Sequence, residues 1–208
     1  MSQIKEKRNA PIRQNREKAL AFLAKAARRH DTDPDHSRQV TALALLLFDE
    51  LYPLHGYDAE ERFLLEVAGL LHDIGWSKVV SGRHHKISRD IINDLAIPGI
   101  NLLDRFTCAL VARYHTKSLP DRTKHRQFAS LVPERQNLVE WLAGILRVAD
   151  GLDCNHRSLI TGLRCAIKKE ELIINLFAEG DCRVQIKRAS EKQTLLEKKT
   201  GKIIVYRC

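Results

Sequence analysis

A histidine and an aspartate stand side by side at His72-Asp73, directly after an apolar run that extends from Phe63 to Leu71. Burying an unpaired charge is costly, and such a group is normally neutralised or given a partner. A divalent cation compensates an imidazole and a carboxylate together, because both are common metal ligands. The pair therefore predicts a metal site at the end of a buried helix.

Other histidine and aspartate residues begin or end apolar helical patterns at wide spacing: His36, His84, His85, His115 and Asp150. A single histidine on an apolar face is more often a satisfied core or boundary residue than a ligand. In a helical bundle, however, several helices can project such residues toward one interior point. It is the number and the order of these residues that favour one shared site.

The elements that must position these residues are mostly helices, since apolar residues recur at helical spacing, as at Val40, Leu43 and Leu47, with His36 on the same face. Asp31–Pro34 predicts a capped turn with proline in the first helical turn. The predicted helices cover residues 15–29, 35–52, 59–72, 84–95, 102–115 and 135–153. The predicted breaks cover residues 53–57, 75–82, 98–99 and 116–126.

After Arg157 the pattern changes. Residues 163–168 and 171–177 predict two short strands, and residues 202–206 predict a third. Residues 181–199 are ambiguous, although their second half favours a helix. The predicted fold class is mainly α, with a small C-terminal α+β appendage. The predicted division is a flexible basic arm (1–14), a helical domain (15–160) and a small tail packed on that domain (161–208).

The composition suits a protein with anionic partners, because 35 Lys and Arg residues outnumber 26 Asp and Glu residues, giving a net charge of +9. Nucleic acid is not indicated beyond this charge, since no basic strand is rich in the aromatic residues that stack on bases. No apolar run approaches the roughly 18 to 20 residues of a membrane span. The N-terminus also lacks a secretory signal. We therefore expect a cytoplasmic protein with no membrane partner.

Five scattered cysteines form no Cys-x-x-Cys pair, and their number is odd. This spacing fits neither a zinc ribbon nor a disulfide framework. We expect free thiols, with Cys108 and Cys165 as core residues.

Four segments, in this order, resemble the HD-domain metal-dependent phosphohydrolases, and more narrowly the C-terminal part of the exopolyphosphatase / guanosine pentaphosphate phosphohydrolase family. The segments are Leu71-His72-Asp73-Ile74-Gly75, His84-His85-Lys86-Ile87-Ser88, Ala112-Arg113-Tyr114-His115 and residues 145–153. Residues 161–207 also resemble the end of that family. The resemblance covers roughly residues 30–208.

This resemblance implies an HD-type helical domain that holds one or two divalent ions, with Mn, Mg, Fe, Co, Ni and Zn all compatible with the ligand types. It implies that His36, His72, Asp73 and Asp150 bind a first metal. It also implies that His84 and His115 bind a second metal or a substrate phosphate. His84 is favoured over His85 by its spacing to Ser88, and we expect His85 to face solvent or to contact the substrate.

The activity that the resemblance implies is metal-assisted hydrolysis of a phosphoester or phosphoanhydride in a nucleotide or another small phosphorylated compound. Asp73 would orient or deprotonate the attacking water. Lys78, Arg113 and Arg147 are candidates for phosphate contact, with a structural ion pair as the competing role of Arg147. Asp153 and His156 are candidates to line the mouth of the site; alternatively Asp153 caps the end of the helix, and we favour this structural role.

Two alternatives remain. The first is a metal-bearing regulatory module that binds polyphosphate or an alarmone nucleotide, for which the basic segment 117–126 would be suited. The second is a di-iron HD oxygenase. The larger family members have an N-terminal ATPase-like half with their exopolyphosphatase site, and this sequence does not contain it, so their activity cannot be carried over. In some large members the HD site is degenerate, whereas the His-Asp pair is intact here. A homodimer is compatible with the sequence.

Overall fold

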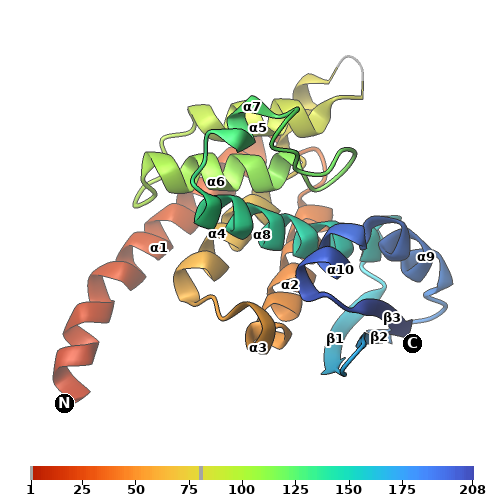
Figure 1. Ribbon diagram of the computed structural model, residues 1–208. Coiled ribbons are helices and arrows are strands. Elements are labelled where there is room, and N and C mark those ends of the chain that lie inside the picture. The colour runs from red at the N-terminus through yellow and green to blue at the C-terminus, as the bar shows by residue number, and fades with distance from the viewer. Residues whose placement is uncertain (1, 80–81) are drawn as a thin grey trace.

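The computed structural model describes residues 2–79 and 82–208 and is mainly helical, with a small sheet at its C-terminal end (Figure 1). The helices of the first part are α1 (Ser2–His30), α2 (Pro34–Glu50), α3 (Tyr52–His55), α4 (Ala59–Leu71), the 3-10 helix η1 (Ile74–Lys78), α5 (His84–Asp94), α6 (Leu102–Arg113), α7 (Arg126–Ala129) and α8 (Pro133–Leu152). The appendage consists of β1 (Ile160–Ile167), β2 (Glu171–Ala178), α9 (Arg183–Lys192), α10 (Thr194–Thr200) and β3 (Ile203–Arg207). The predicted fold class is confirmed.

Helix α8 lies at the centre of the helical part, and most of its residues are buried. Helices α2, α4 and α6 pack against α8, and α5 packs against α6 and η1. Leucines of three of these helices, Leu47, Leu65 and Leu142, are fully buried in the resulting core. Helices that meet around one apolar core can direct polar residues from several elements to one place.

Helix ends are fixed largely by local sequence. The carboxylate of Asp33 accepts a hydrogen bond from the backbone N–H of His36 at 3.1 Å, and Pro34 occupies the first helical turn of α2. This confirms the predicted cap, which satisfies a backbone donor that has no partner within the helix. Asp58 and Glu61 form a reciprocal capping box in front of α4.

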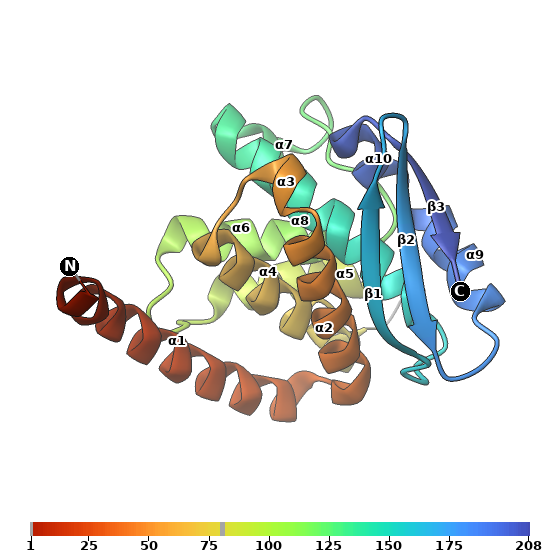
Figure 2. The same ribbon diagram turned by 90° about the horizontal axis from the view of Figure 1, so that it is seen from below.

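Two predicted boundaries were wrong. Helix α1 begins at Ser2 rather than near Asn15, so it includes the backbone of the segment expected to be an arm. This helix packs against α4 and η1, and its N-terminal half extends beyond the bundle (Figures 1 and 2). The predicted break at 53–57 contains the short helix α3, because Pro53 is tolerated in a first helical turn.

The appendage is one three-stranded sheet in the order β1-β2-β3, with β1 antiparallel and β3 parallel to β2. The three predicted strands are confirmed. The ambiguous segment 181–199 forms α9 and most of α10, and Gly201 ends α10 in a left-handed conformation with φ of 67°. Both helices pack on α8, while β1 packs on α2, so the appendage covers one side of the bundle (Figure 2).

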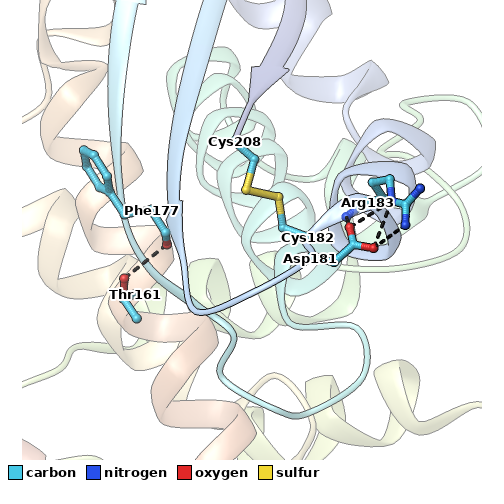
Figure 3. The surroundings of a disulfide bond; sticks show 6 residues. All are labelled: Thr161, Phe177, Asp181, Cys182, Arg183 and Cys208. Atoms are coloured by element: carbon cyan, nitrogen blue, oxygen red, sulfur yellow. Dashed lines mark hydrogen bonds and ion pairs between the residues drawn. A yellow bond between two sulfur atoms is a disulfide. The ribbon is translucent and has the colours of Figure 1, made fainter.

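The expectation of five free thiols was wrong, because Cys182 and Cys208 form a disulfide (Figure 3). Strand β3 runs parallel to β2 and returns the chain end to the residue that precedes α9, across 26 positions of sequence. A pairing that depends on strand topology cannot be read from cysteine spacing. Cys108, Cys154 and Cys165 are free, with Cys108 fully buried as predicted and Cys165 partly exposed against the core.

Within the part of the chain that the structure describes, none of the helices combines the length and apolar character of a membrane span.

Candidate metal centre

Six polar residues predicted to act together lie in one place in the structure. They are His36 of α2, His72 and Asp73 at the end of α4, His84 at the start of α5, His115 after α6, and Asp150 of α8. Five of them line a cavity of about 290 Å³, and His72 lies beside it with no exposed surface. The order of these six residues along the sequence therefore predicted a set that five separate segments of the chain bring together.

The carboxylate of Asp73 lies between two groups of ligand atoms. Its Oδ2 atom is 3.7 Å from Nε2 of His72 and 3.9 Å from Nε2 of His36. Its Oδ1 atom is 3.3 Å from Nε2 of His84 and 3.4 Å from Nε2 of His115. Asp150 Oδ1 completes the first group, 3.5 Å from His36 Nε2 and 3.9 Å from His72 Nε2. One carboxylate thus faces both groups with a different oxygen.

Hydrogen bonds on the outer side of the rings orient three histidines. The Nδ1–H of His72 donates to the carbonyl of Gly69 at 2.7 Å, and that of His115 donates to the carbonyl of Ala112 at 2.7 Å. The Nδ1–H of His36 donates to Asp153 Oδ2 at 2.8 Å. Because a carbonyl only accepts, each of the two bonds to a carbonyl places a ring proton on Nδ1 and turns Nε2 toward the site, where Nε2 of His115 lies 3.2 Å from Nε2 of His84. This is the outer-shell arrangement that holds histidine ligands in metal sites.

Several potential metal-ligand atoms in the site are buried with no hydrogen-bond partner among the described residues: His36 Nε2, His72 Nε2 and Asp73 Oδ1. Leaving a buried polar atom unpaired costs about 1 to 3 kcal/mol, so such atoms are rare and call for a physical explanation. Here the atoms converge, and they are imidazole nitrogens and a carboxylate oxygen. The residues present therefore fit a divalent cation of the Mn to Zn series or Mg.

Electrostatics in the first group depend on its carboxylates. Burial lowers the pKa of His36, but the Asp150 and Asp153 carboxylates outweigh it and raise that pKa to about 10. Burial favours the neutral form of Asp150, but the Lys192 ammonium and His36 hold the pKa of this carboxyl well below its usual range. With no cation present, His36 is therefore protonated at neutral pH and Asp150 is ionised.

The second group, formed by His84, His115 and Asp73, has a different protonation pattern. Burial lowers the pKa of His115 to about 3 and also lowers the pKa of His84, with Asp73 opposing the shift in both. Burial opposes ionisation of Asp73, but the neighbouring histidines, His72 foremost, lower its pKa. At neutral pH this group therefore offers neutral imidazoles and an ionised carboxylate, the protonation states that metal binding needs.

The close approach of α5 to η1 places His84 beside Asp73. A Cβ atom on Gly75 would lie 2.3 Å from the carbonyl oxygen of His84 and 2.6 Å from the backbone nitrogen of Ser88. The backbone N–H of Gly75 also donates to Ser88 Oγ at 2.9 Å. Only glycine leaves this space, which explains why glycine follows the His-Asp pair so closely and why a small residue occupies position 88.

The appendage contributes two cations to the cavity that sequence reasoning did not identify, Arg188 and Lys192 of α9. The Lys192 ammonium hydrogen-bonds to Asp150 Oδ2. Helix α9 lies close to α8 at Gly151, where an added Cβ would be 2.6 Å from the Cα of Ala189. The one available signal was the excess of basic residues between 168 and 202, which does not show which residues reach the site.

Two residues near the centre support it from outside. Asp153, 1% exposed, orients His36 and accepts a hydrogen bond from the Ser158 N–H at 2.8 Å. His156 stacks on the His36 ring at 3.8 Å between centroids and hydrogen-bonds to Asp33 at 2.7 Å. Asp153 thus has the structural role we favoured, while His156 both supports His36 and lines the cavity.

The predicted phosphate contacts lie elsewhere. Lys78 is exposed at the end of η1 and is not among the residues that line this cavity. Arg147 is buried and donates to the carbonyls of Tyr114, Lys117 and Lys192, the closest at 2.9 Å, so its partners are backbone rather than an acidic side chain. The geometry therefore gives Arg147 a structural role.

The two remaining candidates, Arg113 and His85, are not among the residues that line the cavity of the centre. Arg113 lines a separate cavity. His85 is 4% exposed, which corrects the expectation that it faces solvent, because its helix packs on α6. Burial, followed by the charge of Arg113, lowers the pKa of His85 to about 4. His84, stacked on Trp76 at 4.2 Å, is the histidine of the pair that reaches the centre.

A family model described as Ppx/GppA phosphatase, domain III, matches residues 16–197 of the chain. The match includes all six residues of the centre as well as Arg188 and Lys192. A search of curated proteins found no match.

Proposed function

This chain belongs to the Ppx/GppA phosphatase family, and from that premise we propose that it is a metal-dependent phosphohydrolase of the HD type. Its substrate would be a phosphoester or phosphoanhydride in a nucleotide or another small phosphorylated compound. The family supports a phosphorylated substrate, and the centre supports the metal dependence. A phosphatase site needs positive charge to stabilise the oxygens of the transferred phosphoryl group, and its metal and cationic residues supply it.

The observation that carries the proposal is the convergence of unpartnered, buried ligand atoms around Asp73. His36, His72 and Asp150 would hold one divalent ion, and His84 and His115 would hold a second, with Asp73 shared between them. Bound there, the ions would supply Lewis acidity, lowering the pKa of a water molecule and neutralising charge on the phosphoryl oxygens.

The chain's own residues have separate tasks in this proposal. Burial opposes ionisation of Asp73, but its histidine neighbours lower its pKa, so this carboxylate is ionised at neutral pH and would orient the attacking water as a hydrogen-bond acceptor. Asp153 holds His36 in its orientation through the 2.8 Å hydrogen bond.

Substrate phosphate would be bound by the cations of α9 rather than by Lys78 or Arg147. Arg188 and Lys192 line the cavity that contains His36, Asp73 and Asp150. The Lys192 ammonium pairs with the carboxylate of Asp150. Guanidinium and ammonium groups beside a metal are the usual phosphate partners, because charge-assisted hydrogen bonds are the stronger ones.

Elemental analysis of the purified protein, combined with a turnover panel of p-nitrophenyl phosphate and nucleotides in added Mn²⁺ or Mg²⁺, tests the proposal. We expect one to two metal ions per chain and hydrolysis. The Asp73→Asn variant should lose most of the bound metal and most of the hydrolytic activity. The control variant Asp35→Asn removes the same charge from the exposed neighbour of His36, and it should change neither the metal content nor the hydrolysis.

Each contrary result has a defined meaning. Metal without turnover on any phosphate would reject hydrolysis in favour of a metal-bearing binding module. Iron retained with a mixed-valent spectrum would instead point to oxygen chemistry. A protein that binds no metal, or an Asp73→Asn variant that keeps the wild-type metal content, would refute the ligand assignment.

A further inference from the structure

A second cavity of about 300 Å³ lies between α5, the end of α6 and the segment that leads into α7. Ligand pockets start at about this size. Five of its lining residues are cationic: Lys86, Arg89, Arg113, Lys124 and Arg126. No carboxylate is among the described residues that line it. It shares no lining residue with the metal centre.

Arg113 is the most unusual of these cations because it is 6% exposed. Its Nη2 donates to Ser118 Oγ at 3.3 Å, and its Nη1 is buried with no hydrogen-bond partner. No carboxylate among the described residues forms an ion pair with it. The other buried arginine, Arg147, donates to three backbone carbonyls. A buried guanidinium with free donors is expensive unless an anion binds it.

The charges around Arg113 are only partly compensated. Arg89 pairs with Asp90 at 2.7 Å, and Lys124 pairs with Asp121 at 3.8 Å. In the described part of the chain, Lys86 and Arg126 have no carboxylate partner. The Nδ1 atom of His125, which also lines the cavity, is buried without a partner. The cavity therefore contains three uncompensated positive charges and two buried nitrogen atoms without partners.

We propose that this cavity binds a compact phosphate-class anion with several negative charges, of which pyrophosphate is the simplest, at a site separate from the metal centre. Three uncompensated cations match a multiply charged anion better than a single carboxylate. The planar guanidinium of Arg113 suits two oxygens of one phosphate. A nucleic acid fits less well, because the aromatic ring beside the cations, Tyr114, is 2% exposed and cannot stack on a base.

The experiment is isothermal titration calorimetry of the full chain with methylenediphosphonate, a pyrophosphate analogue whose P–C–P bridge resists hydrolysis. Arg113→Met keeps a similar unbranched apolar stem and removes the charged guanidinium group. We expect an affinity loss of about tenfold or more, because one side of a buried charge contact is removed. Arg122→Met is the matched control, since Arg122 is exposed in the same segment and does not line the cavity. It should change the affinity less than about threefold.

Two further variants keep the proposal testable if Arg113→Met does not fold. Lys86→Ala combined with Arg126→Ala alters two exposed side chains and should also weaken binding about tenfold or more. The Asp73→Asn variant, which disrupts the metal centre, should bind methylenediphosphonate as tightly as the wild-type protein does. Binding that is lost in Asp73→Asn would place the ligand at the metal centre and overturn the proposal. So would equal losses in Arg113→Met and Arg122→Met, or no binding to the wild-type protein.

Discussion

Replacing Gly151 by alanine should move α9 away from α8 and weaken phosphate binding without removing a metal ligand. The two helices lie very close together at this residue, where a Cβ atom would lie 2.6 Å from Ala189 Cα and 2.8 Å from Ala189 N. Both are backbone atoms of a helix that carries Arg188 and Lys192 into the cavity. They cannot rotate aside as a flexible side chain could.

The size of the effect follows from these distances. Ordinary van der Waals contact begins near 3.4 Å, so α9 must retreat by about 0.8 Å. Overpacking of this kind costs about 1 to 3 kcal/mol. The better helix propensity of alanine returns about 1 kcal/mol. A net loss of up to about 2 kcal/mol lowers the melting temperature by roughly 4 to 8 °C in a chain of this size. A misplacement approaching 1 Å should raise KM for the phosphorylated substrate by about tenfold.

Thermal unfolding measures the stability, elemental analysis measures the metal content, and steady-state kinetics measure KM. Gly144→Ala is the matched control, because it lies in the same helix and its Cβ would be 3.2 Å from Leu196 of α10, a separation that needs a shift of only about 0.2 Å. It should leave KM unchanged. If Gly151→Ala is as stable as the wild type and has the same KM, the proposed role of α9 in substrate binding is refuted.

Three further predictions concern the metal centre. Asp150→Asn should lose the ion bound with His36 and His72 but keep the one beside His115, giving about half the wild-type metal content by elemental analysis; unchanged content would contradict the two-group assignment. Because the pKa of His36 is about 10 without a cation, a metal at Nε2 must displace a proton, so metal affinity should rise by up to about tenfold per pH unit from about pH 6 to 9 and fall as the solution is acidified. Calorimetric titrations at several pH values measure this slope, and a flat profile would count against His36 as a ligand. Deleting residues 1–14, which contain none of the proposed ligands, should leave kcat/KM unchanged, and a loss of turnover would reveal a role for that segment.

The sequence predicted much of the fold because helices and strands depend on local patterns. The cap at Asp33 and Pro34 and all three strands required only neighbouring residues. The beginning of α1 was not predicted, because polar basic residues resemble an arm when no neighbouring helix is known. The short helix α3 was missed because proline marks both a break and a first helical turn.

The chemistry of the centre was also present in the sequence, as the order of histidines and aspartates along the chain. The choice between His84 and His85 followed from spacing, and the structure places His84 in the cavity and His85 outside it. Adjacent helical residues differ by about 100° in direction, so only one of the two can point to a given place.

What only the tertiary structure decided depends on contacts between residues far apart in sequence. The chain by itself determined which elements form and which residue types could bind a metal. Packing decided that Asp73 faces two ligand groups, that α9 brings Arg188 and Lys192 to the centre and that Cys182 meets Cys208. It also left Arg113 buried, with no counter-charge among the residues that the structure describes. Local sequence fixes the direction of a side chain within its own element, but its partners are fixed only when the elements come together around a common core.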